Sequence, residues 1–78
     1  NELEQAIADF DQALTLDPGF AVAYMKRGLA LLNQGKATEA LRDFEQAQTI
    51  DPNLKDRLSP LIEAARSSPP KRITITAN

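Results

Sequence analysis

The stretch AIADFDQALTLDP at residues 6–18 recurs 34 residues later as ALRDFEQAQTIDP at residues 40–52. Eight of the thirteen positions are identical, whereas chance matching at average composition gives about one. The remaining pairs are mostly conservative, such as Ile7 with Leu41. A fixed period of this size is typical of stacked helical repeats, in which a single unit cannot bury its own apolar face. The repeat therefore predicts an all-α, helix-turn-helix solenoid.

Apolar residues recur at the spacing of an amphipathic helix in four parts of the chain. The expected helices cover residues 2–17, 20–33, 37–50 and 54–66. Pro18 and Pro52 end the first and third helices, because proline lacks an amide hydrogen and disfavours helical geometry in the residue before it. Gly35 suits the left-handed residue that closes the second helix. We expect Phe10 and Phe44, in the middle of their apolar stripes, to be largely buried between helices.

The pattern resembles the tetratricopeptide repeat, and one complete copy can be laid along residues 21–54. The residues that carry the resemblance are Tyr24, Gly28, Leu31, Ala40, Phe44, Ala47 and Pro52. Arg27 departs from the pattern, because the family usually carries a leucine there. Residues 6–18 match the second helix of a preceding copy, and residues 56–65 match the first helix of a following one. The resemblance implies a helical domain of about 1.5–2 repeats over residues 1–66.

Proteins of that family bind extended peptides in a concave surface lined mainly by the first helix of each repeat. The inward-facing positions that the resemblance implies in this chain are Val22, Met25, Lys26, Leu29, Leu32 and Asn33. Such a surface suits a hydrophobic segment with an acidic or polar flank. Members that bind chaperone tails carry lysines and asparagines where this chain has Met25 and Leu29, so that ligand is disfavoured. The alternative interpretation is that Met25 and Leu29 pack against a neighbouring helix.

The first predicted helix carries an apolar stripe that its partner helix would partly cover in a full repeat. The large residues of this stripe are Leu3, Ile7, Phe10 and Leu14. Leaving such side chains in water forgoes roughly 1.5–3 kcal/mol each, and contiguous apolar patches are uncommon on soluble monomers. We therefore expect a self-association face at these residues, most simply in a symmetric homodimer. The alternative is a fragment of a longer array, in which another segment covers the stripe.

The residue types exclude most catalytic sites within this chain. It has no histidine and no cysteine, so Ser-His and Cys-His nucleophile arrangements and the usual zinc sites are excluded. The acidic pairs Asp9 with Asp11 and Asp43 with Glu45 do not converge, because residues two apart on a helix point about 200° away from each other. We expect a non-catalytic module that binds a protein or peptide, without a cofactor or metal. A regulatory appendage of an enzyme encoded elsewhere in the gene is a further alternative.

Charge is unevenly distributed along the chain, which has a net charge of −2. Residues 1–25 carry five acids and no base, whereas residues 55–78 carry five bases and two acids. The bases do not alternate with aromatic residues, which argues against nucleic-acid binding. No apolar run approaches the ~20 residues of a membrane helix, and a cytoplasmic location is the default expectation. The composition of residues 67–78 predicts a proline-rich linker and an extended or disordered tail. The alternative is that this segment adds a strand to a partner.

Overall fold

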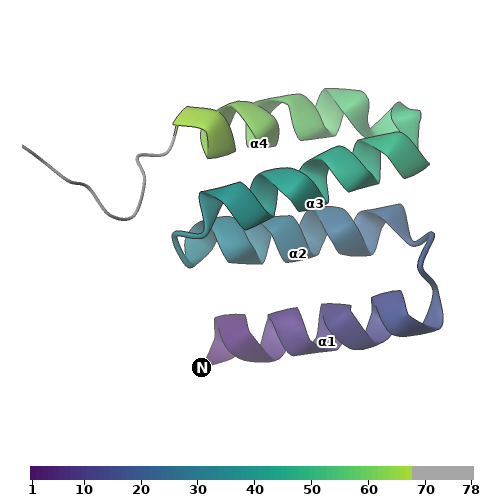
Figure 1. Ribbon diagram of the computed structural model, residues 1–78, viewed down its shortest axis with the longest axis vertical. Coiled ribbons are helices and arrows are strands. Elements are labelled where there is room, and N and C mark those ends of the chain that lie inside the picture. Colours follow the sequence, from purple (N-terminus) through teal and green to yellow (C-terminus); the bar gives the residue numbers. More distant parts are fainter. Residues whose placement is uncertain (68–78) are drawn as a thin grey trace, which may run out of the picture.

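Four α-helices joined by short connections make up the computed structural model, which describes residues 1–67 (Figure 1). The elements are α1 (Glu2–Leu16), α2 (Ala21–Asn33), α3 (Ala37–Ile50), the short 3-10 helix η1 (Pro52–Leu54) and α4 (Lys55–Ser67). Figure 1 shows them following one another in chain order, with α1 at one side of the stack and α4 at the other. No strand occurs in residues 1–67, so the all-α prediction is confirmed. Ser67 ends α4, and the rest of the predicted tail lies outside the described residues.

The repeated Asp-Pro sequence makes the same turn after α1 and after α3. The Asp17 carboxylate accepts a hydrogen bond from the backbone N–H of Gly19 at 3.1 Å. The Asp51 carboxylate accepts one from the backbone N–H of Asn53, also at 3.1 Å. Aspartate side chains stabilise turns by bonding the backbone two residues later in this way. Both helices therefore end because of the local Asp-Pro sequence that follows them.

The turn between α2 and α3 depends on Gly35, the glycine that was expected to close the second helix. Gly35 has a φ angle of 83°, in the left-handed region that side chains with a Cβ atom disfavour. The N–H of Lys36 bonds the carbonyl of Leu31 at 2.9 Å, and the N–H of Gly35 bonds that of Leu32 at 2.9 Å. These two bonds satisfy carbonyls that the end of a helix leaves without partners. The chain can therefore reverse direction within three residues.

The hydrophobic core lies between α2, α3 and α4. Phe44 of α3 and Leu58 of α4 are completely buried at its centre. Helix α1 contacts α2 and no other helix of the described chain. Phe10, the repeat counterpart of Phe44, is consequently only half-buried. The expectation that both rings would be largely buried was wrong for Phe10, because α3 has a neighbouring helix on each side in the described residues whereas α1 has one.

Close packing of α2 on α3 explains the glycine in the middle of α2. A Cβ atom at Gly28 would lie 2.6 Å from Cε1 of Phe44 and 3.1 Å from the carbonyl oxygen of Ala40. Contacts below 3.0 Å require a neighbouring atom to move, and Phe44 is buried on all sides. Hydrogen therefore fits at this position and a methyl group does not.

Candidate functional site

The binding positions expected on α2 divide into two groups in the structure. Lys26, Leu29 and Asn33 are exposed, and Leu29 exposes 40% of its surface. The partly buried positions, which pack against the hydrophobic core, are Val22, Met25 and Leu32. Met25 therefore packs against the core, which was one interpretation of it, whereas Leu29 leaves 40% of its surface exposed. Lys26 makes no hydrogen bond or ion pair with another side chain of residues 1–67.

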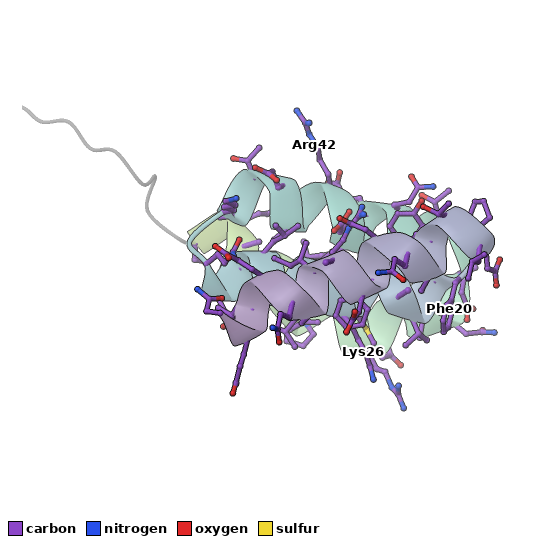
Figure 2. The ribbon with its side chains drawn as sticks, turned by 90° about the horizontal axis from the view of Figure 1, so that it is seen from below. Phe20, Lys26 and Arg42 are labelled. Carbon is purple, nitrogen blue, oxygen red and sulfur yellow. The ribbon has the colours of Figure 1, made fainter. Side chains whose placement is uncertain are left out.

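Phe20 adds an aromatic side chain to this surface that was not predicted from the sequence. It stands at the N-cap position of α2 and exposes 44% of its surface. Figure 2 shows Phe20 and Lys26 on the same side of the molecule, with Arg42 extending from the opposite side. N-cap positions favour residues whose side chains bond the helix backbone, and Phe20 makes no such bond. An apolar residue at this position was the signal that could have identified it.

On α4, the positions equivalent to the expected binding positions by the 34-residue repeat are mostly polar. The residues of α4 that stand 34 positions after the six expected binding positions are Asp56, Ser59, Pro60, Glu63, Arg66 and Ser67. All six are exposed, and α4 contacts α2 directly. The hydroxyl of Ser59 donates a hydrogen bond to the carbonyl of Lys55 at 2.9 Å, so it is already engaged. These α4 positions carry both signs of charge and no large apolar side chain.

Arg27, the departure from the family pattern, ties three helices together. Its Nε and Nη2 atoms donate to the two carboxylate oxygens of Asp43 on α3 at 2.8 and 2.9 Å. Its Nη1 atom donates to Asp11 on α1 at 2.8 Å. The guanidinium also lies 5.5 Å from the centre of the Tyr24 ring, within the range of a cation–π contact. One side chain on α2 thus satisfies two carboxylates from the helices on either side of it.

The electrostatics of this cluster are those of a structural ion pair. The hydrogen bond to Asp43 is the main cause that raises the pKa of Arg27 above its ordinary value; desolvation acts against it, and Asp11 adds to it. Asp43 is only 6% exposed, and both of its carboxylate oxygens already accept hydrogen bonds from Arg27. The sequence suggested only pairs of acidic residues within one helix, Asp11 with Asp9 and Asp43 with Glu45. The useful signal was an arginine at a position where the family usually carries leucine, because a buried arginine needs carboxylates from adjacent helices.

The expected self-association face differs from the surface that the structure leaves open. Leu14 is buried and Ile7 packs against the core. Since α2 is the only helix that α1 contacts in the described chain, these two side chains face α2 and do not form an outer patch. Leu3 and Phe10 are half-buried. An apolar stripe on a helix does not indicate which of its two possible neighbours is present, so self-association through α1 stays a prediction.

Three other features bear on the function. An open pocket of about 460 Å³ is lined by Glu45, Gln48, Thr49 and Pro52, on α3 and the turn after it. None of the expected positions on α2 lines this pocket.

Residues 1–67 contain no group of three or more acidic side chains placed to hold a metal ion. None of the helices in this part of the chain is both long enough and apolar enough to cross a membrane.

Comparison with known families supports the repeat found in the sequence. The model of the tetratricopeptide repeat family matches residues 1–54, which include α1, α2, α3 and the turn into α4. No curated protein and no solved structure matched the chain. The matched region contains both copies of the repeated segment and the complete unit from α2 to η1. Repeats of this kind generally mediate protein–protein interactions. This chain belongs to the tetratricopeptide repeat family.

Proposed function

We propose that the chain is a non-catalytic binding module that holds a peptide segment of a partner protein against one face of α2. This α2 binding face consists of Phe20, Lys26 and Leu29. The observation that carries the proposal is the exposure of two large apolar side chains, Phe20 and Leu29, beside a lysine that has no side-chain partner in residues 1–67. Exposed aromatic and aliphatic residues act as anchors in interfaces, and a nearby charge selects the partner.

The chemistry of the face specifies the kind of segment that it fits. Lys26 and Leu29 are three positions apart on one helix and are therefore neighbours on its surface. Phe20 lies on the same side of the molecule as Lys26 (Figure 2). An apolar residue of the partner can cover Leu29 or Phe20, while an aspartate or glutamate beside it pairs with Lys26. We therefore propose an apolar peptide with an acidic flank as the ligand.

Self-association is the second candidate function. The residues first expected to support it are partly turned towards α2, because Ile7 packs on the core and Leu14 is buried. The peptide-binding proposal does not depend on them, since Phe20, Lys26 and Leu29 lie on or at the start of α2. A homodimer that forms through α1 would leave the α2 binding face free. The two functions can therefore be tested separately.

Selection from random peptides displayed on phage, with the full chain as bait, tests the proposal. We expect the enriched peptides to combine large apolar residues with aspartate or glutamate. One enriched peptide is then synthesised, and its affinity is measured for the wild type and for Lys26→Glu. Reversing the charge should weaken binding about tenfold or more. A peptide with its acidic residues changed to lysine should bind Lys26→Glu better than it binds the wild type.

Arg42→Glu is the matched control, because Arg42 is exposed and extends from the opposite side of the molecule (Figure 2). It changes the net charge by the same amount as Lys26→Glu, so it separates a local contact from general electrostatic attraction. We expect it to bind the selected peptide as the wild type does. Equal weakening by both variants, or enriched peptides without acidic residues, would overturn the proposal.

A further inference from the structure

The open pocket at the end of α3 is separate from the α2 binding face. It has a volume of about 460 Å³ and is lined by Glu45, Gln48, Thr49 and Pro52. Binding sites for small groups span about 300–1,000 Å³, so its size suits such a group. Glu45, Gln48 and Thr49 stand at positions i, i+3 and i+4 and therefore project from one side of α3. We call these four residues the α3 pocket.

The α3 pocket offers hydrogen-bond acceptors and a negative charge. The exposed Glu45 side chain forms no ion pair within residues 1–67. The Thr49 hydroxyl donates its proton to the backbone carbonyl of Glu45 at 3.0 Å, which leaves its oxygen to accept. The side-chain amide of Gln48 has an acceptor oxygen as well. This lining suits a cation with several N–H donors.

The first copy of the repeat shows what a carboxylate binds at this position. Asp11 is the counterpart of Glu45, 34 residues earlier. Its carboxylate accepts a hydrogen bond from Nη1 of Arg27 at 2.8 Å. The residue 34 positions after Arg27 is Leu61, which packs against the core. The second copy therefore keeps the carboxylate without the guanidinium, and Glu45 is available to a guanidinium from another molecule.

Gln48 is a second difference between the two copies. Its counterpart Leu14 is buried, with 8% of its surface exposed. Gln48 is half-buried and lines the pocket. The second copy thus places an amide near the Glu45 carboxylate, where the first copy has an apolar side chain. The polar lining is therefore a property of the second copy and not of the repeat in general.

We propose that the α3 pocket binds the guanidinium group of an arginine side chain from a partner protein. A guanidinium is planar, carries five N–H donors and no acceptor, and its fork matches a carboxylate at two points. In the pocket the fork pairs with Glu45, and the remaining N–H groups face the oxygens of Gln48 and Thr49. The methylene stem of the arginine lies along the apolar ring of Pro52.

The probe is arginine with an acetylated amino group and a methylamide at its carboxyl group, so that the guanidinium is its only charge. It is titrated into the ¹⁵N-labelled full chain, and amide chemical shifts are recorded. We expect saturable shifts at Glu45, Gln48 and Thr49, including the side-chain amide of Gln48. Shifts that do not saturate, or that saturate only elsewhere in the chain, would overturn the proposal.

Two related probes test which part of the ligand is recognised. The lysine derivative with the same blocking groups should bind at least about threefold more weakly, because an ammonium does not match the carboxylate at two points. Equal affinity for the two derivatives would overturn recognition of a guanidinium. Free arginine should bind no better than the blocked form, since the lining offers its carboxylate only the amide of Gln48 as a donor. Tighter binding of free arginine would identify an amino acid as the ligand and overturn the proposal.

Substitutions in the pocket test the contacts one at a time. Glu45→Gln removes the charge at constant shape and should weaken binding of the arginine derivative about fivefold. Gln48→Leu introduces the residue of the first copy, removes an acceptor and should also weaken binding about fivefold. Thermal melting verifies that both variants are folded. Wild-type affinity in either folded variant would overturn the proposed contacts.

Glu39→Gln is the matched control for Glu45→Gln. Glu39 is another exposed carboxylate of α3, and it points about 120° around the helix axis from Glu45. Because the two variants change the net charge equally, the control separates a local contact from general attraction of a cation. We expect Glu39→Gln to bind the arginine derivative as the wild type does. Equal losses in both variants would overturn the proposal.

Discussion

Arg27 and Asp43 form a two-point ion pair across the interface of α2 and α3, with N–O distances of 2.8 and 2.9 Å. The carboxylate is almost completely buried, whereas the arginine side chain keeps a quarter of its surface exposed. A buried carboxylate is tolerated only when its oxygens accept hydrogen bonds. Arg27 supplies both bonds and reaches Asp11 with its remaining nitrogen, so the side chain that departs from the family pattern links α2 to both of its neighbours.

The first prediction concerns this ion pair. Arg27→Met keeps the apolar stem but leaves Asp43 buried without its partner, and should lower the free energy of unfolding by about 2–4 kcal/mol. Asp11→Asn should cost less than ~1 kcal/mol, because Asp11 is 55% exposed and its pair is screened by water. Thermal and urea melting followed by circular dichroism measure both changes.

The double variant Arg27→Leu with Asp43→Leu is the control for the first prediction. Replacing both members of a buried ion pair by apolar residues is often neutral or stabilising. The double variant should therefore be more stable than Arg27→Met alone. If Arg27→Met melts like the wild type, the ion pair contributes nothing to the stability of the fold, and Arg27 does not hold the three helices together.

The second prediction concerns the close approach of α2 to α3. Gly28→Ala should gain about 1 kcal/mol in helix propensity, but it places a methyl group 2.6 Å from the Phe44 ring. Overpacking of this kind costs typically about 1–3 kcal/mol, and the completely buried ring has little room to move. The clash should prevail, and Gly28→Ala should unfold at lower urea concentration than the wild type. Combining it with Phe44→Leu should cost less than the sum of the two single changes.

The third prediction contrasts the two repeat-related phenylalanines. Phe44→Ala removes a completely buried ring and should destabilise the domain by about 3–5 kcal/mol. A core of this size gives a total stability of only about 3–5 kcal/mol, so the variant should be largely unfolded at room temperature. Phe10→Ala removes a half-buried ring and should cost about 1–2 kcal/mol. Equal costs would mean that α1 has a second neighbour in solution.

The local parts of this structure were predictable from the sequence, because they depend on residues close together in the chain. The Asp-Pro turns and the left-handed Gly35 are each determined by a few adjacent residues. Phe10 and Phe44 show the limit of this reasoning. Their local sequences are nearly identical, but their burial differs, because burial depends on which helices surround them.

The candidate site was predictable in part. The family pattern placed Lys26 and Leu29 on the surface where the structure exposes them. It gave no reason to include Phe20, since the complete copy of the pattern begins at residue 21. The contact of Arg27 with Asp43 spans sixteen residues and depends on how α2 and α3 are aligned against each other. Periodicity within one helix contains no information about that alignment.

The last prediction distinguishes recognition from packing on α2. Leu29 is 40% exposed and Leu31 is 7% exposed, although they stand two positions apart on the same helix. Leu31→Asp places a charge in the core and should unfold the domain, because an unpaired buried carboxylate has a large desolvation cost. Leu29→Asp should change the free energy of unfolding by less than ~1 kcal/mol, since exposed positions tolerate polar residues. It should nevertheless weaken binding of the peptides selected on the wild type, by removing an apolar anchor of the α2 binding face.

Melting and titration of the same samples separate the effect of Leu29→Asp on stability from its effect on peptide binding. A Leu29→Asp chain that unfolds would show that this side chain packs within the domain, and a stable chain that binds as well as the wild type would remove Leu29 from the binding face.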